Sequence, residues 1–109
     1  MIINIIGRGE GYEDGYTAEG LKWGINSWVP SLDVYFEIHP PDHPFHEKNK
    51  RELANALEYG TKCITHDREQ MDKIMRAFGT DYFGSSVDWV IAMAILANAT
   101  VIHLWGITM

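Results

Sequence analysis

Cysteine is nearly absent from this chain of 109 residues, in which Cys63 is the only one. A single thiol excludes an intramolecular disulfide framework and a zinc site built from several thiolates. Cys63 stands between Lys62 and Ile64, in an apolar stretch where a cysteine usually behaves as a small buried hydrophobe. We therefore expect Cys63 to pack as an apolar side chain.

Long hydrophobic runs are also missing. The longest apolar stretch, 87–97, is interrupted by Asp88 and is far shorter than the ~20 residues that span a bilayer. Residues 1–6 lack a basic start, contain Asn4 and lead directly into a glycine loop, so they do not read as a signal peptide. These features predict one domain, residues 1–109, that is cytoplasmic and has no membrane partner.

Positive charge is scarce, because 9 Lys and Arg face 15 Asp and Glu and leave a net charge of −6. Duplex nucleic acid and anionic membranes attract such a surface only through a strong local basic patch. The densest basic stretch, 48–51, is bordered by Glu47 and Glu52, which is typical of a solvated helix face. The charge therefore predicts no duplex nucleic acid partner.

The chain does contain a regular alternation of short β-type runs and helical patterns. The β-type runs predict strands over 2–6, 22–26, 33–39, 61–65 and 100–105. Helices are expected over 46–59, from a cap at Asp67 to Phe78, and over 84–98, whereas 12–22 is a loop or one short helix. The alternation predicts an α/β fold: a Rossmann-like sheet of about five mostly parallel strands flanked by helices.

The last of these helices is apolar on nearly all sides between Val87 and Ala97. A sheet covers only one side of a helix, and a helix that is hydrophobic all round is normally buried all round. We therefore predict a homo-oligomer in which a second copy covers helix 85–98, and which also protects the strand edge before Met109. The alternative is that residues 10–22 form a third layer over this helix.

Parallel sheets bind ligands beyond the carboxyl ends of their strands, where loops meet helix N-termini. At the first loop, Gly7 and Gly9 would let backbone amides approach a ligand, and Arg8 could pair with a phosphate. The spacing G-x-G-x-G differs from the dinucleotide fingerprint G-x-G-x-x-G. At the last loop, Ser85 and Ser86 offer hydroxyls and free N–H groups at a helix start, either as an anion site or as a simple cap.

Histidines and one tryptophan complete the candidate ligand contacts. Residues 39–46 hold three of the five histidines, and His66 is expected to point into the same region. Zinc needs three or four converging ligands, so we expect no metal and instead imidazoles, His39, His43 and His66, that line a pocket. Trp28, in the loop beside Asn26, is the tryptophan expected to stack on a base.

Several stretches resemble a family of small phage-encoded Rossmann-like proteins: the glycine loop after the first strand, 23–26, 36–39, and the closing runs 82–86 and 102–109. More distantly, the same frame is similar to bacterial CMP-sugar sialyltransferases and hydroxymethylpterin pyrophosphokinases, in which a glycine loop and a serine-rich helix start hold nucleotide phosphates. The resemblance implies nucleotide contacts from Gly7, Gly9, Asn26, Ser85 and Ser86. The chain departs from the enzymes by having Glu10-Gly11 in place of Pro-Ser and Thr108 in place of an aspartate, and by lacking their further strands.

The leading hypothesis is a phage protein that binds a nucleotide or nucleotide-derived small molecule without turning it over. Such a protein would serve to sequester a nucleotide signal of host immunity in the host cytoplasm. One alternative is a nucleotide-dependent transferase or pyrophosphokinase-like enzyme with His39 or His66 as acid/base. Another is an oligomeric interaction module that docks through its last helix. The sequence specifies no cofactor.

Overall fold

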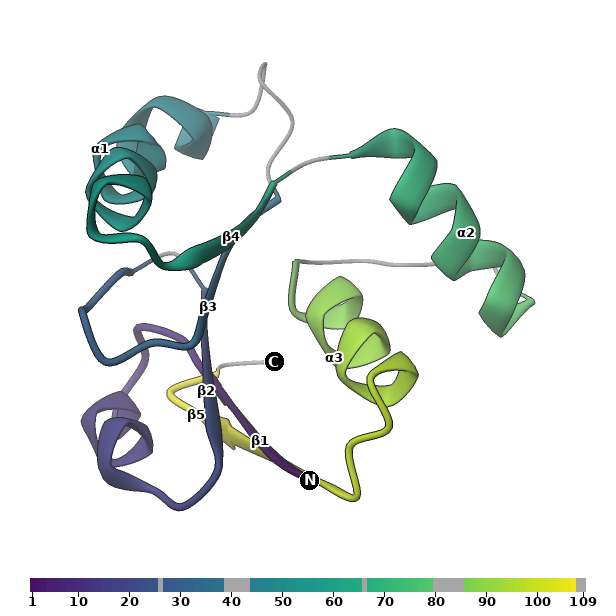
Figure 1. The fold of residues 1–109 in the computed structure, drawn as a ribbon, viewed down its shortest axis with the longest axis horizontal. Helices are drawn as coiled ribbons and strands as arrows, with labels where there is room; N and C mark the ends of the chain where they lie inside the picture. The colour runs from purple at the N-terminus through teal and green to yellow at the C-terminus, as the bar shows by residue number, and fades with distance from the viewer. Residues whose placement is uncertain (26, 39–43, 66, 80–85, 108–109) are drawn as a thin grey trace.

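A computed structural model describes residues 1–25, 27–38, 44–65, 67–79 and 86–107, with the backbone alone at 44–48 and 86. Strands and helices are interspersed along the chain, as the sequence predicts (Figure 1). In chain order the elements are β1 (Ile2–Ile6), the 3₁₀-helix η1 (Tyr12–Thr17), β2 (Leu21–Ile25), β3 (Val34–Glu37), α1 (Pro44–Tyr59), β4 (Lys62–Thr65), α2 (Arg68–Phe78), α3 (Ser86–Leu96) and β5 (Val101–Trp105).

The five strands form one sheet in the order β4-β3-β2-β1-β5, and every neighbouring pair is parallel. β1 lies between β2 and the edge strand β5, with Ile3 opposite Leu21 of β2 and opposite Ile102 of β5. The predicted α/β fold with a Rossmann-like parallel sheet is therefore confirmed. The five strand predictions differ from the observed bounds by no more than one or two residues at each end.

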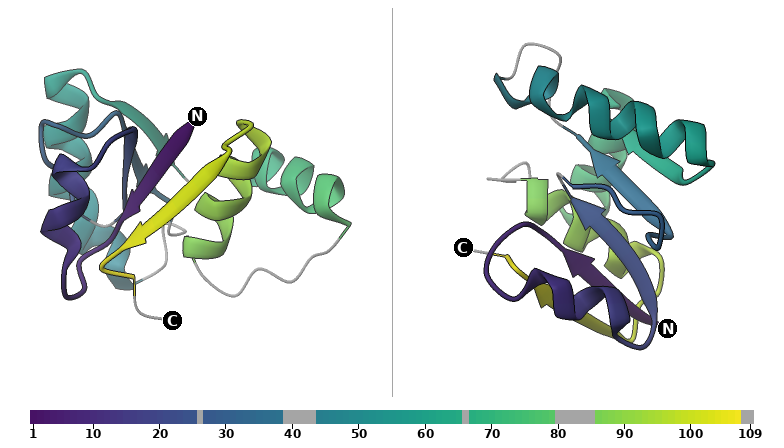
Figure 2. Two further views of the ribbon diagram at one scale, coloured as in Figure 1. Left: turned by 90° about the horizontal axis from the view of Figure 1, so that it is seen from below. Right: turned by 90° about the vertical axis from the view of Figure 1, so that its left-hand side faces the viewer.

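The sheet is the middle of three layers (Figures 1 and 2). η1 and α1 cover one face, and α2 and α3 cover the other. Side chains alternate between the two cores, as a strand requires: Val34 and Phe36 of β3 face α2 and α3, whereas Tyr35 between them faces α1. Strands buried on both faces read as nearly continuous apolar runs, which is why the sequence showed β-type runs rather than strict alternation.

The helix ends follow local capping chemistry. Oδ1 of Asp67 accepts hydrogen bonds from the amides of Glu69 (3.0 Å) and Gln70 (3.2 Å), so the predicted cap of α2 is confirmed. α2 ends at Gly79, whose left-handed backbone lets its N–H bond back to the carbonyls of Arg76 and Met75. The short helix that was one of two options for 12–22 is η1.

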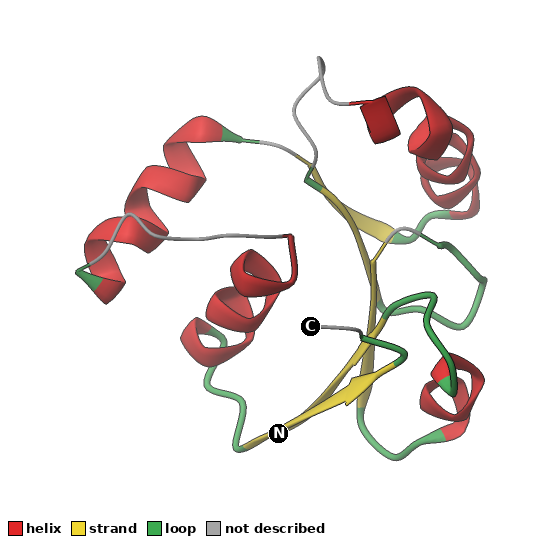
Figure 3. Cartoon of the chain, turned by 180° about the vertical axis from the view of Figure 1, so that it is seen from behind, coloured by secondary structure: helices red, strands yellow, loops and turns green. Residues whose placement is uncertain are grey.

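α3 is covered by the sheet and by α2, and not by residues 10–22. Val90, Ala92, Met93 and Ala94 are buried, while Ile95 and Leu96 each keep 49% of their surface exposed. η1 contacts β1 and β5 on the opposite face of the sheet (Figure 3). The alternative to a partner copy, a third layer from 10–22 over α3, is therefore wrong, because the chain leaves β1 toward the other face of the sheet.

Cys63 packs as expected, on the face of the sheet that carries α1. Its thiol donates to the carbonyl of Thr61 at 3.3 Å, and burial raises its pKa. The thiol therefore stays protonated at neutral pH. Among the described residues, no helix is both long enough and apolar enough to cross a membrane.

Candidate functional site

The carboxyl ends of the five parallel strands meet at one edge of the sheet, and β1 and β5 lie side by side there. The chain leaves β1 toward η1 on one face, whereas Ile107, just after β5, packs into the core on the other face. Such a reversal is the topological switch point at which open α/β sheets place their ligands. α3 runs antiparallel to β5, so its first residue, Ser86, lies at the same edge (Figure 2).

The glycine loop after β1 is packed against the segment that follows β5. The amide of Gly7 donates to the carbonyl of Trp105 at 2.9 Å, and the amide of Gly9 donates to that of Gly106 at 2.7 Å. A Cβ on Gly7 would lie 2.8 Å from the carbonyl oxygen of Gly106, so glycine is needed here for close approach of two backbone segments. These two amides are used within the protein, and any ligand contact from this loop must come from other atoms.

Arg8 is the candidate for such a contact, because its side chain is exposed at this loop. Burial raises the pKa of Tyr16 and of Tyr35 above its ordinary value, and the positive charge of Arg8 partly opposes that rise in both. The structure thus places an exposed guanidinium in the loop after β1, and its pairing with a phosphate stays a prediction.

Tyr35, Glu37 and Glu52 form a polar group that sequence reasoning missed. Tyr35 is fully buried, and its hydroxyl has no hydrogen-bond partner among the described residues. Burial, and then the nearby carboxylates of Glu37 and Glu52, raise its pKa. Tyr35 and Glu37 alternate with apolar residues in β3, so both point to the face of α1. A charged residue inside a strand that is otherwise apolar was the signal that could have found this group.

Trp28 lies away from the switch point. Its indole N–H donates to the hydroxyl of Thr61 at 3.0 Å, and Thr61 directly precedes β4, at the amino-terminal edge of the sheet. Its ring lies 5.5 Å from that of Tyr59, and its amide donates to Glu52 at 3.0 Å. With Asn55, Glu58 and Tyr59 it lines a separate hollow of about 400 Å³ on α1. The structure therefore does not bring Trp28 together with Gly7, Arg8 and Gly9.

The other predicted site residues are described in part or not at all. Ser86 opens α3, which fits its predicted place at a helix start, although the structure gives only its backbone. The start of α2 does not offer an anion site, because the carboxylate of Asp67 already accepts hydrogen bonds from two of the amides there. The remaining candidates lie outside the described residues: Asn26, His39, His43, His66 and Ser85.

In the part of the chain that the structure describes, no group of three or more His, Cys, Asp and Glu side chains is arranged to hold a metal ion. The side chains of 39–46, where three histidines occur, are outside that part. What the described site offers is the exposed guanidinium of Arg8 and the start of α3.

The chain matches no protein-family model, no curated protein and no solved structure.

Proposed function

We propose that this protein binds an anionic, nucleotide-like small molecule at the carboxyl edge of its sheet and does not turn it over. One juxtaposition carries the proposal: the start of α3 lies at the same edge as the chain after β1, where β1 and β5 form the switch point. A helix N-terminus presents free N–H groups and a partial positive charge, and both favour a phosphate or carboxylate.

Arg8 adds a positive charge to the loop after β1, in a chain whose net charge is negative. The protein has a net charge of −6, so a free nucleotide is repelled except near a local cation. A guanidinium at the switch point can bind a phosphate through two parallel hydrogen bonds. The hydroxyls of Ser85 and Ser86 are proposed to complete the anion site at the start of α3.

Binding without turnover rests on the resemblance to small phage-encoded Rossmann-like proteins and on the departures of this chain from the related enzymes: Glu10-Gly11 stands in place of their Pro-Ser, and Thr108 stands in place of their aspartate. The resemblance favours sequestration of an intact nucleotide signal. We propose this role for a phage-encoded protein in the cytoplasm of its host.

Self-association through α3 belongs to the same proposal. Ile95 and Leu96 at the end of the helix are each 49% exposed, whereas Val90, Ala92, Met93 and Ala94 of the same helix are buried. β5 is an edge strand on which Val101 and Leu104 remain 42% and 41% exposed. A second copy would bury these apolar side chains and protect the strand edge.

Thermal shift against mononucleotides, dinucleotides and cyclic dinucleotides tests the proposal. A ligand at one hundred times its Kd stabilises the folded state by about 2.7 kcal/mol, which raises the melting temperature of a domain of this size by about 10 °C or more. Release of the ligand by heat, followed by mass spectrometry, should recover it chemically intact. A chemically altered product would overturn the non-catalytic role, and no shift with any nucleotide would overturn the binding proposal.

Variants locate the site. Ser85→Ala with Ser86→Ala, and separately Arg8→Gln, should each weaken nucleotide binding roughly tenfold, because each removes charge-assisted or neutral hydrogen bonds to the anion. Ser31→Ala, at an exposed turn between β2 and β3, and Arg68→Gln, on exposed α2, are the matched controls. If the controls weaken binding as much as the site variants, the assignment to this edge is wrong.

A further inference from the structure

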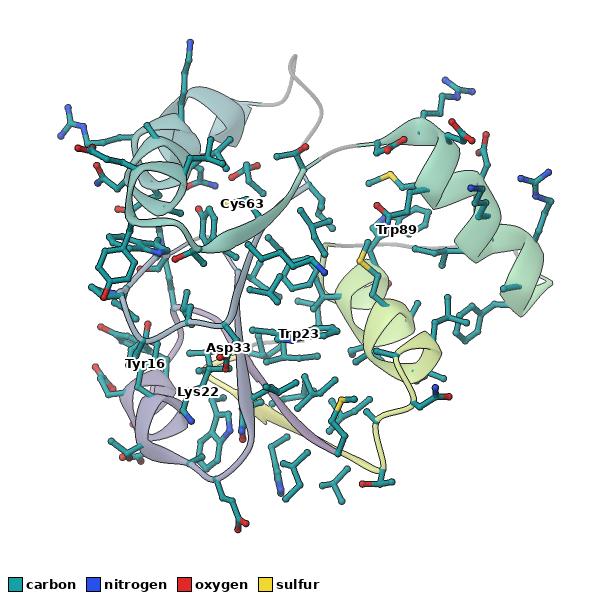
Figure 4. All side chains as sticks on the ribbon, viewed as in Figure 1. Tyr16, Lys22, Trp23, Asp33, Cys63 and Trp89 are labelled. Atoms are coloured by element: carbon teal, nitrogen blue, oxygen red, sulfur yellow. The ribbon has the colours of Figure 1, made fainter. Side chains whose placement is uncertain are left out.

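A groove of about 520 Å³ lies between α2, α3 and the sheet, on the face opposite α1. Figure 4 shows Trp23 projecting from β2 into the layer beneath α3. The groove's size falls within the range of about 300–1,000 Å³ that small-molecule sites occupy. Its apolar walls come from three elements of the sheet and from both helices: Trp23, Val34, Ile64, Ile74, Met93 and Leu96.

The walls of this groove are fixed by packing. Trp23, Val34, Ile74 and Met93 are each less than a tenth exposed even though they line it, so they belong to the core as well as to the groove. α2 contributes the small side chain of Ala77 on the groove side, which leaves room between this helix and β4. A ligand would therefore bind to a largely preformed site, and little side-chain entropy would be lost on binding.

The groove is distinct from the site proposed above. Val34 and Lys62 begin their strands, and Leu96 ends α3, so the groove lies toward the amino-terminal edge of the sheet. The start of α3 and the loop after β1 lie at the opposite edge. Binding at one place can thus be tested without occupying the other.

Among the described residues that line the groove, the charged ones are Lys62 on β4 and Lys73 on α2, and both are exposed. In a chain of net charge −6, two lysines with no carboxylate among the described lining residues favour an anion. Lys73 lies 3.7 Å from Glu69, but both side chains are mostly exposed, and such surface pairs are worth about 1 kcal/mol or less. A ligand carboxylate can therefore compete for Lys73.

We infer that this groove binds an amphipathic monoanion, namely a fatty-acid-like molecule with an apolar body and a single carboxylate. The apolar body occupies the walls formed by Trp23, Ile64 and Ile74, and the carboxylate pairs with Lys62 and Lys73 at the rim. Burial of the alkyl chain supplies most of the affinity, at about 0.8 kcal/mol per CH₂ group. The lysines supply the preference for an acid over an uncharged chain.

Titration calorimetry with decanoate and with decan-1-ol tests this inference. Decanoate should bind roughly tenfold more tightly than the alcohol, because two exposed ion pairs contribute on that order. Methyl resonances of Ile64, Ile74 and Met93 should shift in NMR spectra on addition of decanoate. Equal affinity for the acid and the alcohol would overturn the assignment of the lysines, and unshifted methyl groups would overturn the assignment of the groove.

Two variants separate charge from shape. Lys62→Gln with Lys73→Gln should remove the roughly tenfold preference for decanoate, whereas Arg68→Gln with Arg76→Gln, the same change of charge at exposed positions of α2, should keep it. Ala77→Trp should fill the groove and abolish binding of both probes, and because Ala77 is exposed the fold should survive. Decanoate affinity unchanged in either groove variant would overturn the inference.

Discussion

The indole N–H of Trp105 donates a hydrogen bond of 2.9 Å to Oδ1 of Asn4, which joins the side chains of the two neighbouring strands β5 and β1. Asn4 is fully buried, and its Nδ2 also donates to the carbonyls of Glu19 and Leu21, at 2.9 and 3.1 Å. One amide therefore connects β1, β5 and the start of β2. Since the carbonyl of Trp105 accepts from Gly7, the same cluster supports the loop at the switch point.

Replacement of Asn4 by Leu should lower the free energy of unfolding by about 2 kcal/mol. The change keeps the side-chain volume similar but leaves the indole N–H and two carbonyls without their partner. Urea unfolding, followed by circular dichroism, measures the effect. Asn55→Leu, at an exposed position of α1, is the matched control and should change stability by about 0.5 kcal/mol or less. An Asn4 variant as stable as this control would contradict the role of the cluster.

Gly106→Ala should cost more stability than Gly79→Ala, although the two glycines have nearly the same backbone, with φ of 63° and 66°. Both variants carry the strain of a left-handed alanine, about 1 kcal/mol. A Cβ on Gly106 would also lie 2.5 Å from Cβ of Tyr12 and 2.7 Å from the carbonyl oxygen of Gly9, whereas Gly79 has open space around it.

The crowding at Gly106 should add about 2 kcal/mol to the loss. Chemical denaturation of both variants gives the difference directly. Equal losses would show that the segments after β1 and β5 can separate at little cost. The close approach would then impose no constraint on the shape of the proposed site.

Much of the fold could be predicted from local patterns. The β-branched run at 2–6 and the helical spacing of Met71, Ile74 and Phe78 each reflect a period that the backbone imposes, and the structure has a strand and a helix there. Asp67 caps α2 by accepting from amides only two and three residues later in the chain, so this cap could also be predicted from the sequence. The parallel sheet agrees with the helical patterns between the predicted strands, because a crossover between parallel strands usually contains a helix.

The site was harder to predict because it depends on contacts between distant parts of the chain. The amides of Gly7 and Gly9 were expected to face a ligand, but they bond to the carbonyls of Trp105 and Gly106, about a hundred residues later in the chain. The position of Trp28 likewise depends on its hydrogen bonds to Thr61 and Glu52, which are distant in the sequence. The spacing of neighbouring residues does not predict such contacts.

Tyr35→Phe should leave the protein as stable at pH 7 as the wild type, or more stable by about 1 kcal/mol, because the hydroxyl that it removes is buried without a described partner. The difference should grow in alkali. Burial raises the pKa of Tyr35 in the folded state, so above the ordinary value near pH 10 the unfolded chain loses this proton first. The wild type should then lose up to about 1.4 kcal/mol per pH unit from this group, and the variant should not.

Urea unfolding between about pH 8 and pH 11 measures this alkaline loss. Tyr59→Phe, which removes an exposed phenol from α1, is the matched control. A Tyr35 variant whose stability falls with pH as steeply as that of the control would mean that water reaches the Tyr35 hydroxyl in the folded protein.

Ile95→Asp should convert the proposed oligomer to a monomer. Ile95 is 49% exposed at the end of α3, and a carboxylate there would be buried without a partner if a second copy covers this helix. Dissociation should become at least about 100-fold more favourable, since an unpaired buried charge costs several kcal/mol. Leu57→Asp places the same charge on α1, at a residue 60% exposed on the other side of the sheet, and should leave assembly unchanged. Light scattering over a range of concentrations measures the mass of both variants. A wild-type protein that is already monomeric throughout that range would exclude a partner copy on α3 and leave Ile95 as an ordinary exposed side chain.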